Sequence, residues 1–213
     1  MQVIPAINAP DFETAKKLIT IASGFSDWVH IDVGDGAFSS IKTWDKPEEF
    51  RIMNQELGIR EMEAHLMVVD PLNCAEAWLL AGVERLIIHL ETVNEQQVGR
   101  LLDLCKKYNA DLMLSIAPEI PVEKFWPYID RVSYFQILAV DPGRAGQGFQ
   151  PIVLEKIKLL RQKAPNAKIE VDGGINLETA KVIKEAGADI IVSASYIFDS
   201  SDPEIAYRKL QNI

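Results

Sequence analysis

Histidine and aspartate side chains stand at the ends of several apolar, strand-like segments. One segment ends in His30-Ile31-Asp32, another contains His65 and a third ends at Asp172. Side chains alternate between the two faces of a strand, so His30 and Asp32 share a face. Two imidazoles and two carboxylates directed at one point favour a site for one divalent cation over four separate hydrogen-bonded packing residues. This ligand set suits Zn²⁺, Fe²⁺, Mn²⁺ or Co²⁺ better than Ca²⁺.

Glycine-rich turns follow the later strand-like segments and indicate a site for a phosphate group. Two glycines come directly after Asp172, Ser193-Ala194-Ser195 ends the last segment, and a long glycine-rich loop spans 141–148. Backbone N–H groups in such turns bind phosphates, and Arg144 is a possible charge partner in a loop that could act as a lid. These turns and the loop with Arg144 are therefore the candidate phosphate-binding segments.

The other potentially reactive side chains are one histidine and two cysteines. His89 also ends a strand-like segment, where a packing role and a role in supporting metal ligands are equally favoured. Cys74 and Cys105 lie in no Cys-x-x-Cys pair and cannot form a disulfide framework, so they are expected to be small buried side chains. We expect a reduced, cytoplasmic protein.

A short pattern recurs three times along the chain and indicates how these residues are positioned. An alanine and a glycine precede a spacer and a β-rich run at Gly24, Gly82 and Gly187; at the first of these a serine separates the two. The pattern is typical of a helix that ends with a left-handed glycine and is followed by a buried strand. Repeated helix-to-strand steps predict β/α units with a parallel sheet.

Eight strands and intervening helices are predicted from hydrophobic periodicity and helix start signals. The predicted strands are Val3–Ile7, Trp28–Val33, Met62–Met67, Leu86–Leu90, Leu112–Ile116, Val132–Leu138, Lys168–Val171 and Ile190–Ser193. The predicted helices include Asp11–Ser23, Pro71–Ala81, Glu95–Tyr108, Ile152–Lys163, Glu178–Ala186 and Pro203–Gln211. Asp70, Asn176 and Asp202 are the predicted N-caps.

Eight units in 213 residues predict a single (β/α)₈ TIM barrel, one domain over residues 1–213. Each unit has about 27 residues, at the compact end for this fold. A doubly wound open sheet would usually have a glycine-rich turn after its first strand, whereas this chain has Asn8-Ala9-Pro10-Asp11 there. In a barrel the carboxyl ends of the strands form the active face, which gathers the candidate residues.

Composition excludes several classes of function. The chain has 22 basic and 31 acidic residues, a net charge of −9, so neither nucleic acid nor an anionic membrane is expected to bind through net charge. Its apolar runs are shorter than the roughly 18 residues of a membrane span. Its first residues also lack the layout of a signal peptide.

The motifs His30–Gly36, Ala64–Met67, the loop from Pro142 to Gln147 and Val171–Gly174 resemble signatures of ribulose-phosphate 3-epimerases over essentially the whole chain. The resemblance implies a barrel of the ribulose-phosphate-binding type with a metal held by His30, Asp32, His65 and Asp172. It also implies that the phosphate or substrate is bound by Gly143, Arg144, Ala145, Gly146, Gly173, Gly174, Ala194 and Ser195. It implies that Asp32 and Asp172 act as acid and base on opposite faces of a phosphorylated ketose, with D-ribulose 5-phosphate to D-xylulose 5-phosphate as the lead reaction of the pentose phosphate pathway. The family is generally oligomeric, so we expect a homo-oligomer.

Several ligand-facing positions depart from the family pattern. Ala6 replaces a serine, so a hydroxyl near the reacting oxygens is missing. Gly34 replaces a methionine and is expected to leave space beside the metal, and Ala194 replaces a glycine at the phosphate site. The loop after the first motif lacks the usual histidine and asparagine, and Arg144-Ala145 replaces the usual Phe-Gly. These departures favour retained metal chemistry on a different phosphorylated sugar.

Two other functions remain open at this point. A related barrel decarboxylase or synthase would carry an Asp-x-Lys-x-x-Asp motif on the third strand, where this chain has His65 and Val68 in place of the lysine and the last aspartate. The departures at Ala6, Gly34 and Ala194 are also compatible with a sugar-phosphate-binding protein that has lost turnover. Retained metal chemistry is favoured because all four metal positions are intact.

Overall fold

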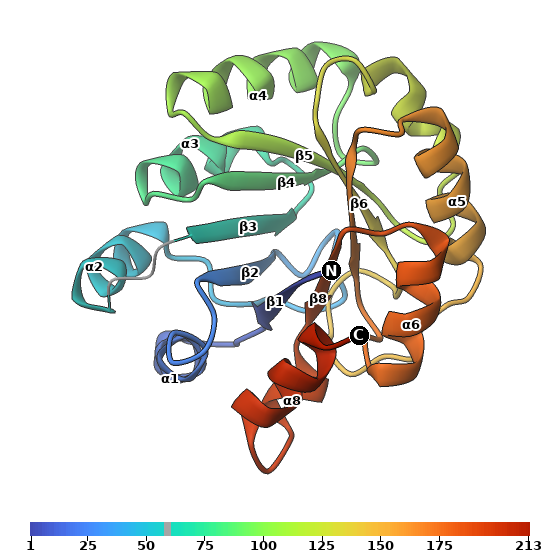
Figure 1. The fold of residues 1–213 in the computed structure, drawn as a ribbon. Helices are drawn as coiled ribbons and strands as arrows, with labels where there is room; N and C mark the ends of the chain where they lie inside the picture. The colour runs from blue at the N-terminus through green and yellow to red at the C-terminus, as the bar shows by residue number, and fades with distance from the viewer. Residues whose placement is uncertain (58–60) are drawn as a thin grey trace.

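Eight apolar segments form parallel strands that close on themselves into a barrel (Figure 1). This computed structural model describes residues 1–57 and 61–213. Each strand pairs with the next, and β1 pairs with β8, which confirms the predicted (β/α)₈ architecture. The strands are β1 (Gln2–Ile7), β2 (Trp28–Gly34), β3 (Glu61–Met67), β4 (Arg85–His89), β5 (Asp111–Ile116), β6 (Tyr134–Leu138), β7 (Lys168–Asp172) and β8 (Ile190–Ser193).

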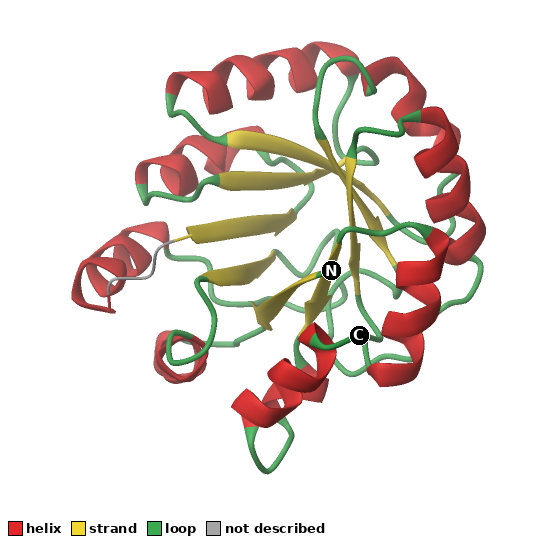
Figure 2. Cartoon of the chain, in the orientation of Figure 1, coloured by secondary structure: helices red, strands yellow, loops and turns green. Residues whose placement is uncertain are grey.

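Helices surround the strands on the outside of the barrel (Figure 2). All six predicted helices are present, with their ends shifted by a residue or two. They are α1 (Phe12–Ala22), α3 (Leu72–Leu80), α4 (Glu95–Lys107), α5 (Val153–Lys163), α6 (Leu177–Ala186) and α8 (Pro203–Gln211). Three further elements were not predicted, namely α2 (Pro47–Leu57), the 3₁₀ helix η1 (Val122–Tyr128) and α7 (Ser195–Phe198). The last two are too short, or too interrupted by Pro127, to show helical periodicity.

The helix-end predictions hold at most but not all positions. Gly82 and Gly187 have φ of +97° and +111°, as the left-handed ending requires. The prediction for Gly24 is wrong, because α1 already ends at Ser23 in right-handed geometry and the N–H of Gly24 bonds to the Ile21 carbonyl. The side chain of Asp70 does not cap α3; Pro71 occupies the cap position and makes no side-chain cap bond.

The predicted caps of α6 and α8 are confirmed. Asn176 accepts hydrogen bonds from the N–H groups of Glu178 and Thr179, and the Thr179 hydroxyl accepts from the Asn176 N–H in return. Asp202 accepts from the Ile205 N–H, with Pro203 at the first helical position. Each side chain satisfies N–H groups that a helix start leaves without internal partners.

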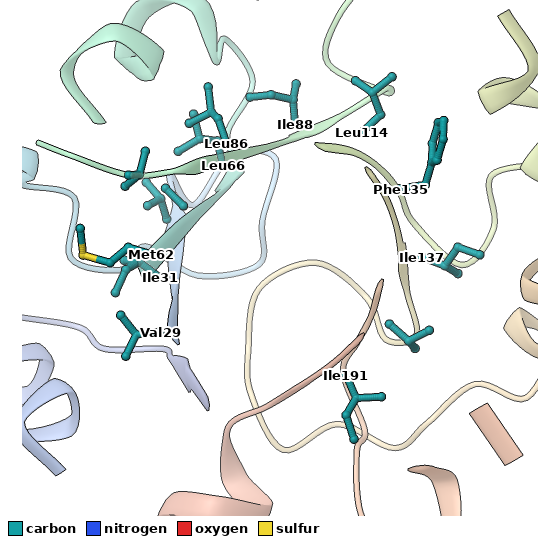
Figure 3. Close-up of a cluster of buried hydrophobic side chains, with 14 of the residues drawn as sticks. Val29, Ile31, Met62, Leu66, Leu86, Ile88, Leu114, Phe135, Ile137 and Ile191 are labelled. Atoms are coloured by element: carbon teal, nitrogen blue, oxygen red, sulfur yellow. The ribbon is translucent and has the colours of Figure 1, made fainter. Parts of the chain in front are cut away.

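Alternation along the strands separates the core from the interior of the barrel. Val29 and Ile31 of β2, Leu86 of β4, and Ile137 of β6 are at most 1% exposed and belong to the layer between strands and helices (Figure 3). Burial of each such side chain contributes about 1.5–3 kcal/mol. The opposite face of β2, which carries His30 and Asp32, therefore points into the barrel.

The barrel interior is apolar on one side and polar on the other. Side chains of β1 and β8 form a small apolar cluster of Ile4, Ala6, Ile190 and Val192. Buried polar and charged side chains line β2 to β7. The interior polar residues are His30, Asp32, Glu63, His65, Arg85, His89, Ser115, Gln136 and Glu170. Among the described residues, no helix combines the length and apolar character needed to cross a membrane.

Candidate metal and sugar-phosphate site

Four side chains from β2, β3 and β7 meet at the carboxyl end of the barrel. The Nε2 atom of His30 lies 3.2 Å from Asp32 Oδ1 and 3.9 Å from Asp172 Oδ2. The Nδ1 atom of His65 lies 3.5 Å from Asp32 Oδ1 and 3.4 Å from Asp172 Oδ2. One ligand atom of each residue lies within 4.8 Å of those of the others. The structure thus brings together all four residues proposed from the sequence as metal ligands.

The donor set fits a divalent cation. Asp32 is 8% exposed, and its Oδ1 atom is buried without a hydrogen-bond partner among the residues that the structure describes. An unsatisfied buried carboxylate oxygen is costly unless a cation or a donor reaches it. Two imidazole nitrogens and two carboxylate oxygens at this spacing can reach one ion of the Zn²⁺, Fe²⁺, Mn²⁺ or Co²⁺ type.

A carboxylate behind His30 fixes which ring nitrogen faces the cluster. The Nδ1 atom of His30 lies 2.6 Å from Glu63 Oε1, and both side chains are fully buried. Because an ionised carboxylate only accepts hydrogen bonds, Nδ1 carries a proton and Nε2 is the nitrogen that faces Asp32 and Asp172. Support of this kind orients a metal-binding imidazole and increases its basicity.

A second chain of hydrogen bonds supports His65 and gives His89 its place. The Nε2 atom of His65 lies 2.8 Å from Nε2 of His89, and Nδ1 of His89 lies 3.1 Å from Glu91 Oε1. Glu91 in turn accepts a bond from the Ala117 N–H. With His89 donating to Glu91, His65 donates from Nε2 to His89 and keeps the Nδ1 lone pair for the cluster. His89 therefore lies directly behind a candidate ligand, as one of the two sequence alternatives proposed.

The electrostatics of the cluster favour positive charge. Burial lowers the pKa of His30, but the nearby carboxylates of Asp32 and Glu63 outweigh burial and raise that pKa well above the usual value. The pKa of His65 is also raised, because Asp172 and Asp32 overcome the effect of burial. Both histidines together hold the pKa of Asp32 far below its ordinary range in spite of its burial. Protons and a metal ion therefore compete for this site.

The glycine-rich turns adjoin the cluster in one pocket. One pocket is lined by Asp32, by Asp172 and by all eight candidate phosphate-binding residues. Gly174 has φ of +67°, and a Cβ there would lie 2.6 Å from the backbone of Phe149. A side chain at this position would therefore displace the loop after β6. The turn after β7 and the loop after β6 are packed directly against each other.

The loop after β6 is exposed in its middle and tied at its ends. Arg144, Ala145 and Gly146 are exposed. The side-chain amide of Gln147 donates to the carbonyls of Asp141 and Arg144, which closes the loop on itself. The exposed part includes Arg144, which lines the pocket.

The expectation of free space at Gly34 is wrong. A Cβ built on Gly34 would lie 2.6 Å from Ser39 Oγ and 2.7 Å from the Ile41 carbonyl oxygen. The Ser39 hydroxyl donates to that same carbonyl, so the loop after β2 has closed over the glycine. The volume that a larger side chain would occupy is filled by this loop.

Three residues that contact the candidate ligands or His89 were not predicted. Asn8 donates to Asp32, Glu63 contacts His30, and Glu91 contacts His89. Each stands two residues from a position already noted, on the same face of the same strand or just beyond its end: Ala6, His65 and His89. Period-two spacing from those positions is the signal that could have found them.

Comparison with solved structures identifies the class of fold. The chain matches a crystal structure of 3-hexulose-6-phosphate synthase with a TM-score of 0.75 and 16% identity, covering 100% of this chain and 99% of the other. It matches KGPDC from Streptococcus mutans in complex with D-R5P with a TM-score of 0.76 and 13% identity, covering 99% and 95%. At these identities the likeness concerns the fold, that of (β/α)₈ barrels.

Comparison with protein sequences identifies the family. The ribulose-phosphate 3 epimerase family model matches residues 2–198. Ribulose-phosphate 3-epimerase of Helicobacter pylori is 32% identical over 100% of this chain and 98% of that protein. The enzyme of the same name from Chlamydia muridarum is 35% identical over 80% of this chain and 75% of that protein. The chain belongs to the ribulose-phosphate 3-epimerase family.

Proposed function

We propose that this protein is a metal-dependent epimerase that inverts C3 of a ketose phosphate, with D-ribulose 5-phosphate to D-xylulose 5-phosphate as the lead reaction. The convergence of His30, Asp32, His65 and Asp172 beside a glycine-lined pocket carries this proposal. Family membership supports the same reaction class. The altered positions Ala6 and Ala194 both line the pocket and favour testing other phosphorylated ketoses as well.

The four clustered residues would hold one divalent cation. When bound, the cation supplies Lewis-acid stabilisation for the negative charge that develops on the sugar oxygens during proton removal. His30 and His65 present lone pairs to it because Glu63 and His89 occupy their outer nitrogens. The donor set is compatible with Zn²⁺, Fe²⁺, Mn²⁺ or Co²⁺.

Asp32 and Asp172 would carry the proton transfer. They approach the pocket from β2 and β7, so two carboxylates can serve opposite faces of a flat intermediate, whereas one side chain reaches only one face. One carboxylate takes the C3 proton and the other, in its acid form, returns a proton to the opposite face, which inverts the centre. Each transfer is worth roughly 10²- to 10⁴-fold in rate.

The phosphate of the substrate would lie against the turns after β6, β7 and β8. Gly143 to Gly146, Gly173, Gly174, Ala194 and Ser195 line this part of the pocket. Backbone amides suit a phosphate because they present partial positive charge in fixed directions. Arg144 adds a full positive charge to this part of the pocket.

The reaction is tested by proton exchange in D₂O. Metal-replete protein is incubated with a panel of ketose phosphates and followed by NMR, with Asp172→Asn as the inactive variant and the exposed Asp130→Asn as a matched carboxylate control. We expect deuterium at C3 of at least one ketose phosphate with the unsubstituted protein and the control. Ligand-dependent thermal stabilisation with no exchange on any substrate would instead identify a sugar-phosphate-binding protein.

We further propose that the chain acts in the cytoplasm as one folded domain of a homo-oligomer. A relative in Oryza sativa is named as a cytoplasmic isoform, and the two cysteines of this chain are free thiols. Light scattering on the protein as it elutes from a size-exclusion column measures the oligomeric state. A single unfolding transition is expected for one domain. A monomeric mass at micromolar concentration would remove the oligomer from the proposal.

A further inference from the structure

The side chain of Asn8 lies between the candidate catalytic carboxylate and the loop after β6. Its Nδ2 atom donates to Asp32 Oδ2 at 2.8 Å and to the Gly143 carbonyl at 2.9 Å. Asn8 follows the last residue of β1 and lines the pocket with Asp32. One amide group therefore touches two segments that are far apart in the sequence.

The orientation of this amide follows from its neighbours. Both partners are acceptors only, a carboxylate oxygen and a backbone carbonyl oxygen. The nitrogen of Asn8 must face both, and its two N–H groups are both used. The hydrogen bond to an ionised carboxylate is of the stronger, charge-assisted kind.

The two oxygens of Asp32 have different neighbours because Asn8 binds only one of them. Oδ2 is held by the amide, whereas Oδ1 lies 3.2 Å from His30 Nε2 and 3.5 Å from His65 Nδ1. Rotation of the carboxylate would break the bond to Asn8. The amide therefore keeps Oδ1, the oxygen without a hydrogen-bond partner in the described part of the chain, directed at the cluster.

The same amide anchors the loop that would receive the phosphate. The Gly143 carbonyl accepts from Asn8, and the neighbouring Pro142 carbonyl accepts from the Ser40 N–H at 3.1 Å. Gly143 has φ of +127°, and a Cβ there would lie 2.6 Å from Ser40 Oγ. The beginning of the loop is therefore fixed between Asn8 and the loop after β2.

We infer that Asn8 is a positioning residue that couples the phosphate-side loop at Gly143 to the orientation of Asp32. Anion binding on the loop and cation binding at the cluster should then strengthen each other, since both need the same placement of Asn8. This inference rests on the proposed function for the identity of the two ligands. Ala6, the preceding residue on the same strand face, has no polar atom that could do this.

The test measures cation binding rather than turnover alone. Metal-free protein is titrated with Mn²⁺, with and without inorganic phosphate, for the unsubstituted protein, Asn8→Leu and Asn8→Ala. We expect phosphate to tighten Mn²⁺ binding in the unsubstituted protein, by a factor that falls to about one in both variants. Mn²⁺ affinity without phosphate is expected to fall roughly 10- to 100-fold, as for other residues that orient metal ligands.

A matched variant separates coupling from general loosening of the loop. Gln147→Ala removes the bonds that close the loop on itself and touches neither Asp32 nor Asn8. It is expected to speed amide exchange in the loop while leaving Mn²⁺ affinity without phosphate unchanged. With an active substrate, Asn8→Leu should lower kcat roughly ten-fold or more with a smaller change in KM, because Asp32 is misplaced after binding.

Two results would overturn the inference. One is a Mn²⁺ affinity of the unsubstituted protein that phosphate does not change. The other is that the Asn8 variants have the same Mn²⁺ affinity and the same phosphate effect as the unsubstituted protein. If Asn8→Leu does not fold, the Mn²⁺ titrations of Asn8→Ala alone decide the test. Failure of the epimerase proposal looks different. In that case coupling between phosphate and Mn²⁺ persists and depends on Asn8, but no ketose phosphate exchanges its C3 proton.

Discussion

Two clusters of buried charged and polar side chains lie inside the barrel, and their negative charges are compensated in different ways. The open-end cluster consists of His30, Asp32, His65 and Asp172. The inner cluster consists of Glu63, Arg85, Gln136 and Glu170. On β3 and β7 it lies two residues nearer the amino end of the strand than His65 and Asp172. The bond from His30 to Glu63 links the two clusters.

The inner cluster contains its own cation. Arg85 Nη1 lies 3.0 Å from Glu63 Oε2 and 3.7 Å from Glu170 Oε2, and the guanidinium lies between the rings of Trp28 and Tyr134 at 4.4 and 4.3 Å. One arginine cannot compensate two buried carboxylates. Burial and the nearby charge of Glu63 accordingly raise the pKa of Glu170 to about 8, so it stays protonated at neutral pH.

The open-end cluster has an unsatisfied carboxylate oxygen in place of a built-in guanidinium. Asp32 Oδ1, Glu63 Oε2 and Glu170 Oε2 all lack a hydrogen bond within the described residues. The two glutamate oxygens face the guanidinium of Arg85, whereas Asp32 Oδ1 faces two imidazoles. Buried charges of similar type thus serve two purposes. Where a protein side chain supplies the positive charge the cluster is structural, and where it does not the cluster is ready to take a cation from solution.

The largest expected effect is the loss of activity on substitution in the open-end cluster. Asp172→Asn removes a metal ligand and a proton-transfer group together, so activity should fall by roughly 10²- to 10⁴-fold or more, with little loss of stability. The measurement is C3 exchange in D₂O together with metal content and thermal unfolding. An Asp172→Asn protein with near-normal exchange would contradict the assignment of the open-end cluster to metal binding and proton transfer.

Removing the guanidinium of Arg85 from the inner cluster should instead lower the free energy of unfolding. Arg85→Met leaves Glu63 and Glu170 buried without their positive partner, and the expected loss is about 3–5 kcal/mol in urea unfolding. The matched control is Arg131→Met, whose exposed pair with Glu95 at 3.5 Å is worth under about 1 kcal/mol. Equal stabilities for the two variants would show that the inner cluster does not depend on Arg85.

The two clusters should also respond differently to pH. Because the pKa of His30 is raised, its Nε2 must lose a proton before a cation binds, so cation affinity should increase as pH rises. Between pH 6 and 7 the expected gain is about ten-fold for each proton displaced. Isothermal titration with Zn²⁺ in buffers of different ionisation enthalpy counts these protons. An affinity independent of pH would mean that the histidines are not ligands.

The smallest effect is expected at Glu170. A protonated carboxyl resembles an amide, so Glu170→Gln should change stability by about 1 kcal/mol or less at pH 6. In the native protein the pKa of Glu170 is raised above its ordinary value, so the folded state binds the extra proton and loses stability as pH rises from about 4.5 through 8. The glutamine variant lacks this loss and should gain relative stability over that window. A constant difference from pH 5 to 8 would contradict the assignment.

Much of this arrangement could be predicted from local sequence. Alternation placed His30 and Asp32 on the interior face, and the rule that active residues lie at strand carboxyl ends brought His65 and Asp172 to the same place. The family pattern then supplied the phosphate-side residues. These predictions need only the direction of each side chain on its own strand and the order of strands around the barrel.

The remaining features depend on contacts between distant segments. Asn8 acquires its role only because Gly143, which is 135 positions away, comes within hydrogen-bond distance. The space at Gly34 is filled by Ser39 through the fold of an irregular loop, which no periodic pattern describes. Arg85 is a surface-type residue in any single-strand pattern, and only the meeting of Trp28, Tyr134 and Glu63 around it makes its burial tolerable.

The most direct measurement of the central claim is the number of divalent cations bound per chain after metal-free protein is reconstituted with Zn²⁺ and dialysed. We expect one ion per chain, lost in Asp172→Asn and retained in Glu170→Gln, which differ by two positions on the same strand. Retention of the ion in both variants, or no bound ion in the unsubstituted protein, would contradict the account.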